Sequence, residues 1–371
     1  MKTVFPNFKR NILNISATLS DFLGVPNEHA KLKLLQTELS KDYKNIIFIC
    51  FDGLSTYTMK KNLGKNDFLR KNIKQKLTST FPSTTTCATT TLRTAMYPSE
   101  HGWFSWSLYL KEIDKVVCLF RDHDLYTEQP IDANLVSKIL PISAYYNSVP
   151  ENCPYEINTV FQDYKTINAK KHFTFTTIDE QFEHLSKIAK QNSKQFVYSY
   201  NSSPDKEMHL SGLDSRPARE FIKSISRNLQ KFTQEHPDTL LVITGDHGHT
   251  ETKEHINLYE DEELKQYLLC PPYGDARAVS LKAKSGQHRN LLLYICKRYR
   301  RKVKIYKTQK LIDRGVFGPV TGRLDMLGAY ILVPKPNIFF RISENCKIFV
   351  THHSGLTSKE MYVPLILIGN K

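Results

Sequence analysis

The sequence predicts an α/β fold: a doubly wound, mostly parallel sheet with helices on both faces and a small cap insertion. Continuous apolar runs at residues 46–51, 195–200 and 239–244 are typical of strands that are buried on both faces. Helical patterns at 178–191 and 213–236 alternate with these runs, as in the crossover connections of such a sheet. Carboxylates and imidazoles follow the strands closely, which is where open α/β sheets place their sites.

The composition is that of a folded globular protein. The 371 residues suffice for one large α/β domain or two ordinary ones, and 40% hydrophobic with 24% charged residues exclude a disordered chain. Lys and Arg number 52 against 37 Asp and Glu, a net charge of +15. This charge favours anionic partners such as phosphate esters, nucleic acid or an acidic membrane surface. A solvated basic surface explains it equally well.

The seven cysteines are scattered and form no Cys-x-x-Cys pair, which argues against a disulfide framework or a structural zinc site. The N-terminus has no continuous apolar stretch of the kind found in signal peptides. No window approaches the ~18 apolar residues that a membrane span needs. We therefore expect a soluble, cytoplasmic protein without a membrane partner.

Three parts are expected along the chain: an N-terminal helical extension (1–44), a core (45–255 and 328–371) and a cap (256–327). The extension is expected to be helical because its leucines recur at roughly helical spacing between residues 32 and 39. The cap is set apart because the alternation of strand and helix patterns weakens there.

Shorter elements are expected within these parts. They are strands at 115–120 and 362–368, a hairpin near 271–286 and a basic helix over 288–302. The densest basic run, KRYRRKVK, spans Lys297–Lys304. It is interpreted as a solvated helix face, with a phosphate or nucleic-acid contact as the alternative.

Residues 77–102 hold seven threonines between Thr84 and Thr94, more than helix propensity favours. Ser83 and Thr84 are good N-cap residues, so we expect a helix to begin near Thr85. Its free N–H groups and dipole would create an anion site beside the Thr85 hydroxyl. That hydroxyl becomes a nucleophile only if a base or metal removes its proton, so the hypothesis requires metal ligands elsewhere. The alternative is a capped, threonine-rich helix without chemistry.

Candidate ligands follow two of the apolar runs. Asp52 comes directly after the run at 46–51. Asp205 and His209 lie four residues apart beyond the run at 195–200, and on a helix they would face the same way and could share one metal. The alternative for this pair is exposure in a polar loop.

The third run ends in Gly-Asp-His-Gly-His, which contributes Asp246 and His247 between glycines that permit tight turns. A buried strand that ends in this way indicates metal ligation. Near the C-terminus, either His352 or His353 would complete a set of six nitrogen and oxygen ligands. Together with a threonine oxygen, such a set fills two zinc-like sites about 4 Å apart, an arrangement that clamps a phosphoryl group.

These motifs together resemble the alkaline phosphatase superfamily, and most of all its type I phosphodiesterase/nucleotide pyrophosphatase branch. They are FDG, FPSTT with the later PSEHG, YNSSPDKEMH, TGDHGH and HHSGLTSKEMYVPL, spread over about residues 46–368. The resemblance implies an alkaline-phosphatase-like fold and a hydrolase of phosphate esters. It also implies a phosphothreonine intermediate and two divalent metal ions, with zinc favoured and manganese as the alternative.

The resemblance further implies a role for individual residues. Thr85 would be the nucleophile rather than Thr80, because FPSTT and the stretch from Thr94 to Gly102 match the family without a gap. His353 would be the ligand rather than His352, because the family's histidine directly precedes a small-Gly-Leu-Ser/Thr turn. The metal ligands it implies are Asp205, His209 and His353 for one ion, and Asp52, Asp246, His247 and the Thr85 oxygen for the other.

Two departures from the family concern the substrate. Trp106 stands where nucleotide pyrophosphatases carry an asparagine that helps hold a phosphate oxygen, and Ala95 replaces a glycine. We expect a small-molecule or nucleotide-like phosphate ester as substrate, with diesters favoured. The alternatives are a phosphomonoesterase of the same superfamily and a catalytically idle anion- or nucleic-acid-binding protein. A sulfatase is disfavoured, since that branch needs a cysteine or serine where Thr85 stands.

Overall fold

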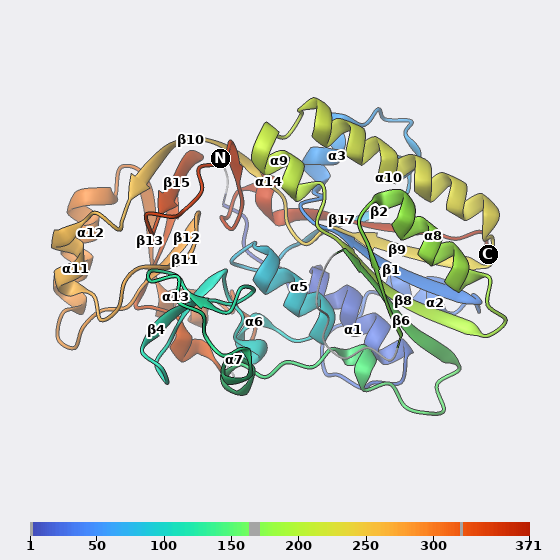
Figure 1. Cartoon of the computed structure of the whole chain (residues 1–371), viewed down its shortest axis with the longest axis horizontal. Helices are drawn as coiled ribbons and strands as arrows, with labels where there is room; N and C mark the ends of the chain where they lie inside the picture. The colour runs from blue at the N-terminus through green and yellow to red at the C-terminus, as the bar shows by residue number, and fades with distance from the viewer. Residues whose placement is uncertain (1–2, 163–170, 320–321) are drawn as a thin grey trace.

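The computed structural model describes residues 3–162, 171–319 and 322–371. Its centre is a seven-stranded sheet in the order β2-β17-β9-β1-β8-β6-β7 (Figure 1). β1 pairs in parallel with β8 and β9, β6 pairs in parallel with β7 and β8, and β17 runs antiparallel to β2 and β9. This mostly parallel sheet confirms the predicted fold class. Its strands are β1 (Asn45–Phe51), β2 (Ile73–Thr78), β6 (Tyr155–Gln162), β7 (Lys171–Phe175), β8 (Lys194–Asn201), β9 (Thr239–Thr244) and β17 (Tyr362–Ile368).

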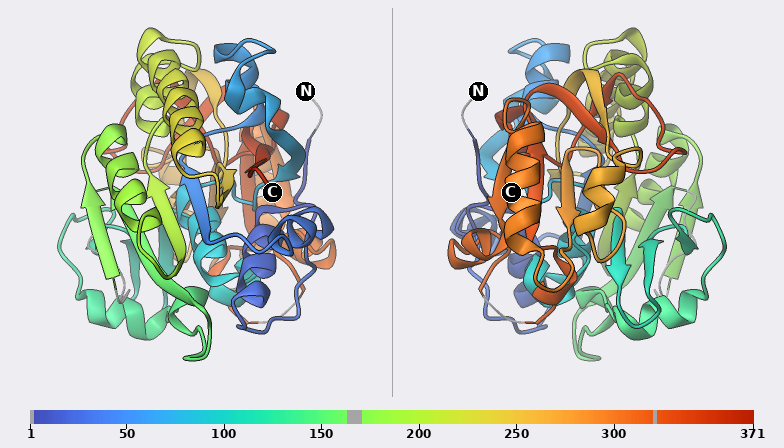
Figure 2. Two further views of the ribbon diagram at one scale, coloured as in Figure 1. Left: turned by 90° about the vertical axis from the view of Figure 1, so that its right-hand side faces the viewer. Right: turned by 90° about the vertical axis from the view of Figure 1, so that its left-hand side faces the viewer.

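Helices cover both faces of this sheet (Figures 1 and 2). Phe48 of β1 packs toward one layer of helices and Ile47 toward the other, because successive side chains of a strand point to opposite faces. Both layers need apolar partners, which explains why β1 reads as a continuous apolar run. One layer consists of α1 (Ile12–Phe22), α2 (Lys33–Leu39) and α5 (Thr85–Thr94), and the other of α3 (Thr56–Asn62), α4 (Phe68–Lys71), α8 (Ile178–Ala189) and α10 (Arg216–Glu235).

The N-terminal segment forms part of the core. Ile12, Ile15 and Leu19 of α1 are fully buried in the same cluster as β1. In α2, Leu35 is buried and Leu34 is exposed, as expected of a helix with one apolar face. The helical character expected for residues 1–44 is present, and α1 and α2 are two of the three helices of this layer. The domain boundaries themselves stay a prediction.

Three small sheets lie beside the central one, at the left of Figure 1. The predicted strand at 115–120 is β4 (Lys115–Cys118), but it pairs with its neighbours β3 and β5 and lies outside the central sheet. Antiparallel neighbours need only short connections, so this local pairing is available without a crossover helix. The small sheets are β3 (Ser107–Leu110), β4 and β5 (His123–Asp124); β10 (Thr250–Asn257), β15 (Asn337–Arg341) and β16 (Thr351–His352); and β11 (Tyr273–Asp275), β12 (Ala278–Leu281), β13 (Val303–Lys307) and β14 (Tyr330–Pro334).

The remaining helices are short, apart from the basic helix α12. β11 and β12 form the expected cap hairpin, and α12 covers most of the expected basic helix. No helix in the described part of the chain is long and apolar enough to cross a membrane. These helices are α6 (Pro98–His101), α7 (Ala133–Ile139), η1 (Tyr145–Asn147), α9 (Asp205–Ser211), α11 (Glu262–Tyr267), α12 (His288–Tyr299), α13 (Thr308–Asp313), η2 (Leu324–Met326) and α14 (Ser358–Met361).

Candidate metal centre and nucleophile

Thr85 begins α5, as the sequence predicts, and its hydroxyl points toward the ends of the central strands. Thr85 Oγ1 lies 3.1 Å from His247 Nε2 and 3.3 Å from Asp52 Oδ2. The N-cap residue is Thr84, and its side chain makes no capping bond to the helix. The first N–H groups of α5 therefore remain available for an anion. Thr80 differs, since its fully buried hydroxyl donates to the Pro82 carbonyl.

One group of candidate ligands consists of Asp205, His209 and His353, with ligand atoms that all lie within 4.8 Å of one another. Asp205 and His209 lie in α9, four residues apart, and His209 Nε2 is 3.4 Å from Asp205 Oδ1. His209 Nδ1 is 2.7 Å from the Thr351 carbonyl and donates to it, which leaves Nε2 free to ligate. The helix expected from the four-residue spacing is therefore present.

The second group consists of Asp52, Asp246 and His247, again within 4.8 Å of one another. Asp52 follows β1 and Asp246 follows β9, two adjacent parallel strands, so their side chains meet at one edge of the sheet. Asp246 Oδ1 accepts the backbone N–H groups of Gly53 (3.0 Å) and His247 (2.9 Å), which fixes the carboxylate. His247 Nε2 lies 3.4 Å from a carboxylate oxygen of each aspartate.

The electrostatics of this second group favour a cation. Burial, followed by the nearby carboxylates of Asp246 and Asp205, raises the pKa of Asp52 well above its ordinary value. Among the described residues, no hydrogen-bond partner reaches Asp52 Oδ1 or Asp246 Oδ2, although both atoms are buried. Unpaired buried carboxylate oxygens are costly. The donor set of carboxylates and imidazoles, with these open oxygens, fits divalent metal ions.

The two C-terminal histidines have different surroundings. His353 stacks on His247 with ring centroids 4.0 Å apart, and burial, followed by the neighbouring His247, lowers its pKa well below the usual range. A neutral imidazole is the form that binds metal. His352 Nδ1 is 2.7 Å from Thr252 Oγ1, and its ring stacks on Phe339. Of the two, only His353 belongs to a ligand group in the described part of the chain.

Sequence reasoning missed His249 as a neighbour of this centre. Its Nε2 lies 2.5 Å from Asp205 Oδ1, and its Nδ1 lies 3.0 Å from Thr351 Oγ1. The second histidine of the Asp-His-Gly-His motif was the available signal. Tyr200 was also missed: its hydroxyl donates to Asp52 Oδ2, and its place at the start of the motif YNSSPDKEMH was the available signal.

The cap hairpin β11–β12 contacts the centre, a contact that no motif in the sequence predicts. Asp275 Oδ1 accepts from the Thr84 hydroxyl (2.9 Å), and Asp275 Oδ2 accepts from the Trp106 N–H (3.2 Å). Arg277, fully buried, pairs with the fully buried Glu360 (Nε to Oε1, 2.7 Å). Glu360 in turn accepts the N–H of Gly355 at 2.9 Å, two residues after His353. The hairpin thus contacts both the start of α5, at Thr84, and the segment that follows His353, at Glu360.

A cavity of about 350 Å³ opens from Thr85 along the first ligand group and past Trp106 and Asp275. The Trp106 ring packs edge-on against Phe120, with centroids 5.9 Å apart, beneath the Arg121 guanidinium. Ala95, the other departure from the family, is the C-cap of α5 with φ 58°, a conformation that favours glycine. It lies at the end of α5 opposite Thr85.

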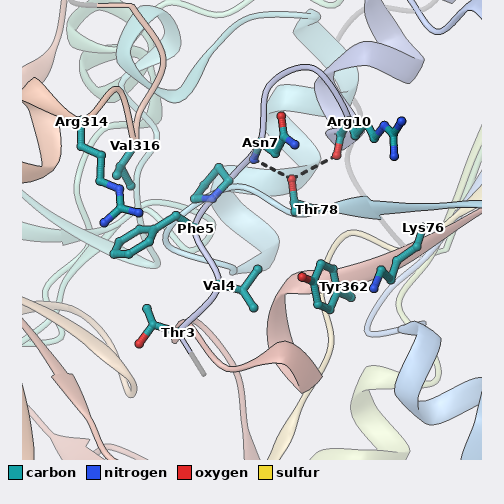
Figure 3. Close-up of a pocket in the computed structure, with 11 residues that line it drawn as sticks. Thr3, Val4, Phe5, Asn7, Arg10, Lys76, Thr78, Arg314, Val316 and Tyr362 are labelled. Atoms are coloured by element: carbon teal, nitrogen blue, oxygen red, sulfur yellow. Dashed lines mark hydrogen bonds between the residues drawn. The ribbon is translucent and has the colours of Figure 1, made fainter. Parts of the chain in front are cut away.

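Two further hollows have different surroundings. One of about 210 Å³ also borders Thr85 and is lined by aromatic rings, among them Trp103, Phe120 and Phe161. The other, of about 520 Å³, lies where the N-terminal segment crosses the sheet edge (Figure 3). Its lining includes Arg314 and Lys76 and none of the residues predicted for the site. Of these three hollows, the 350 Å³ and 210 Å³ hollows border Thr85 and the 520 Å³ hollow does not.

Comparisons with solved structures agree with this fold. The chain is similar to murine ectonucleotide pyrophosphatase/phosphodiesterase 5 (TM-score 0.67, 15% identity, 87% of this chain and 88% of that chain). A structure of an inactive variant of that protein in complex with AMP is equally similar (TM-score 0.67, 15% identity, 88% of each chain). Phosphonoacetate hydrolase from Sinorhizobium meliloti 1021 in complex with phosphonoacetate also matches (TM-score 0.63, 15% identity, 86% and 89%).

No curated protein matches the sequence significantly. The family described as type I phosphodiesterase / nucleotide pyrophosphatase matches residues 46–336, most of the chain. This match confirms the resemblance drawn from the motifs. The chain, with the Thr85 helix and candidate ligand groups at the carboxyl edge of an α/β sheet, belongs to the type I phosphodiesterase/nucleotide pyrophosphatase family and is a hydrolase of phosphate esters.

Proposed function

We propose that the protein is a two-metal phosphodiesterase that acts through a phosphothreonine at Thr85. One observation carries the proposal: the Thr85 hydroxyl, at the open N-terminus of α5, lies 3.3 Å from Asp52 and 3.1 Å from His247, beside the two ligand groups described above. A third group, Asp205, His247 and His249, overlaps both of them. A structural helix cap would not need two sets of converging carboxylates and imidazoles. A threonine that attacks phosphorus needs such ligands, because the metal ions that they hold remove its proton.

The proposed ligands are those that the family resemblance implies. Zinc is the ion we favour, and manganese is the alternative, because carboxylate and imidazole ligands accept both. When bound, the two ions would lower the pKa of the Thr85 hydroxyl and neutralise charge on the attacking and leaving oxygens. The groups proposed to hold them are Asp205, His209 and His353 for one ion, and Asp52, Asp246, His247 and Thr85 for the other.

The chain's own residues would then perform a double displacement. Thr85 Oγ1 forms a bond to phosphorus while the bond from phosphorus to the leaving alcohol breaks, and the leaving alcohol takes up the proton that Thr85 loses. This step gives the free alcohol and a phosphothreonine that still carries the second ester substituent. Water attacks the same phosphorus in the second step and restores the Thr85 hydroxyl. Throughout, the N–H groups at the start of α5 donate to the non-bridging oxygens, where negative charge is concentrated.

The proposed substrate is a small-molecule or nucleotide-like phosphodiester. The aromatic hollow beside Thr85 offers apolar faces on which an organic substituent could stack. The complex of a similar protein with AMP supports a nucleotide-like ligand. A phosphomonoesterase is the alternative that the test below distinguishes.

The test is metal analysis of the purified protein together with turnover of a chromogenic phosphodiester and the matching monoester. We expect two bound metal equivalents and faster turnover of the diester. Thr85→Ala should lower kcat about a thousand-fold or more with metal content and fold retained, because the group that attacks phosphorus is gone. Thr80→Ala is the matched control and should keep substantial activity. An inactive Thr80 variant beside an active Thr85 variant would refute the nucleophile assignment.

We also propose that the protein acts in the cytoplasm. All seven cysteines are free thiols, which is typical of a reducing compartment. Cell fractionation with an antibody against the protein tests this proposal, and recovery in the secreted or membrane fraction would contradict it.

A further inference from the structure

Asp275 is a buried carboxylate at the centre whose presence the proposed chemistry does not explain. Its side chain is on the hairpin β11–β12, in a residue that is 6% exposed, and it borders the same cavity as Thr85. Its two oxygens accept from the Thr84 hydroxyl and from the Trp106 N–H, both neutral donors. In the described part of the chain, no lysine or arginine forms a salt bridge with it.

A buried charge without a cation is unfavourable for folding, so its retention calls for a reason. The neighbouring Glu360 shows the contrast, because Arg277 neutralises that buried carboxylate directly. Burial raises the pKa of Asp275 to about 6, although its hydrogen bonds oppose the shift. At slightly alkaline pH, Asp275 therefore presents a negative charge to the cavity.

This charge lies close to the position of the phosphoryl group. Thr84 directly precedes Thr85, and consecutive Cα atoms are about 3.8 Å apart, so the carboxylate lies within roughly 10 Å of the Thr85 hydroxyl. At that distance and in a partly buried setting, a carboxylate repels each added negative charge noticeably. A phosphodiester carries one negative charge, whereas a monoester carries two above a pH of about 6.

Trp106 strengthens the same effect. The backbone N–H of Trp106 already donates to Asp275, so it is not available to a phosphate oxygen. The indole ring, which packs against Phe120, stands where the family carries an asparagine, so the amide donor of that asparagine is absent as well. The cavity extends beyond the carboxylate past Trp106 and Arg121, which leaves room for a second ester substituent. Trp106 therefore adds no further donor beside Asp275, and the cavity has space for the second substituent of a diester.

We infer that Asp275 is a specificity-determining residue whose carboxylate disfavours dianionic phosphate monoesters and so selects singly charged phosphodiesters. The inference rests on the proposed function and deepens it. The hairpin carboxylate would thus discriminate by repelling the doubly charged monoester, and not by binding the singly charged diester more tightly.

The test compares two probes with the same leaving group, p-nitrophenyl phosphate with two charges and p-nitrophenyl methylphosphonate with one, at about pH 8. Asp275→Asn should raise the ratio of kcat/KM for the dianion over the monoanion on the order of ten-fold. Asp124→Asn is the matched control, because Asp124 is also 6% exposed and accepts two backbone N–H groups, yet does not border the cavity. Its ratio should stay that of the wild type.

A purely structural role would give a different pattern. If Asp275 only clamped Thr84 in place, Thr84→Val would change the ratio as much as Asp275→Asn does, and this result would overturn the inference. An unchanged ratio in Asp275→Asn would overturn it as well. If Asp275→Asn does not fold, the wild type provides the test. For each probe, kcat/KM is divided by the rate of the uncatalysed reaction. A value for the dianion that equals or exceeds the value for the monoanion refutes the charge effect.

Calorimetric binding of inorganic phosphate separates this inference from the proposed function. Asp275→Asn in the metal-loaded protein should bind inorganic phosphate on the order of ten-fold more tightly than the wild type. This measurement needs no turnover. A metal-loaded wild type that hydrolyses neither probe would refute the phosphodiesterase, while equal phosphate affinity in wild type and variant would refute the role of Asp275.

Discussion

Replacing Arg277 by methionine should destabilise the protein by about 4 kcal/mol, because it leaves the Glu360 carboxylate buried without a cation. Loss of one partner from a buried ion pair typically costs about 3–5 kcal/mol. Both side chains are fully buried, and Arg277 Nε lies 2.7 Å from Glu360 Oε1. Arg277 also donates to the carbonyls of Lys335 and Ile338, which would lose this donor. The bonds to Glu360 from the backbone of Gly355 remain and moderate the loss.

The assay is urea unfolding of metal-free protein, so that metal binding does not contribute. Arg216→Met is the matched control, since Arg216 pairs with Glu220 through the same atoms at 2.6 Å but both side chains are exposed. Breaking this surface pair should change the free energy of unfolding by less than about 0.5 kcal/mol. The paired variant Arg277→Met with Glu360→Leu should recover part of the loss, because the unpaired charge is gone.

The pH dependence gives a second readout with a defined sign. In the wild type, burial opposes ionisation of Glu360, but Arg277 outweighs burial and holds the pKa of Glu360 below the usual 4.5. The ionised Glu360 therefore adds to the free energy of unfolding above that pH, and this contribution is lost below it. In Arg277→Met, only the hydrogen bonds from Thr357 and Gly355 still oppose burial, and we expect the pKa of Glu360 to rise. The penalty is then full at neutral pH and shrinks as pH falls through the raised value. A loss below about 1 kcal/mol, or one that does not change between about pH 7 and pH 4, would refute this reasoning.

Three further predictions concern the metal centre and the substrate. His353→Ala should lose one metal equivalent and His352→Ala should keep both, as measured by metal analysis; the opposite pattern would transfer the ligand role to His352. Trp106→Ala should lower kcat/KM for the favoured substrate more than for a small chromogenic ester, since the ring borders the cavity; equal losses would make Trp106 part of the packing only. Chelation should lower the thermal midpoint reversibly, because bound metal adds roughly 4 kcal/mol per site to the free energy of unfolding at a thousand-fold excess of metal over its Kd. An unchanged midpoint would contradict metal binding by the folded state.

The sequence predicted the central sheet well because its signals are local. β1, β8 and β9 are apolar runs of strand length, and the Thr85 helix has its own N-cap signal, so each is visible in a short window. The prediction failed where a strand carries polar residues. β2, β6 and β7 were not predicted, because these strands toward the edges of the sheet include partly exposed polar positions that interrupt the apolar run.

The predicted ligands come together for a topological reason. Residues that follow adjacent parallel strands must meet at one edge of a sheet, so Asp52 and Asp246 could be grouped from the sequence once β1 and β9 were recognised. The family's turn after His353 separated it from His352, and the structure places only His353 in a ligand group within the described residues. Their roles as metal ligands stay predictions.

The sequence by itself thus determined the fold class, the family and the residues proposed for the chemistry. This was possible because the apolar runs of strands, the helix N-cap residues and the motifs each lie within a short segment of consecutive residues. Only the tertiary structure decided which distant side chains surround them. Asp275 and Arg277 lie in a hairpin without any motif, about 190 residues after Thr84 and more than 80 before Glu360, and their contacts depend on how that hairpin docks. Docking of this kind follows from packing and from the burial of charge, which involve the whole chain at once.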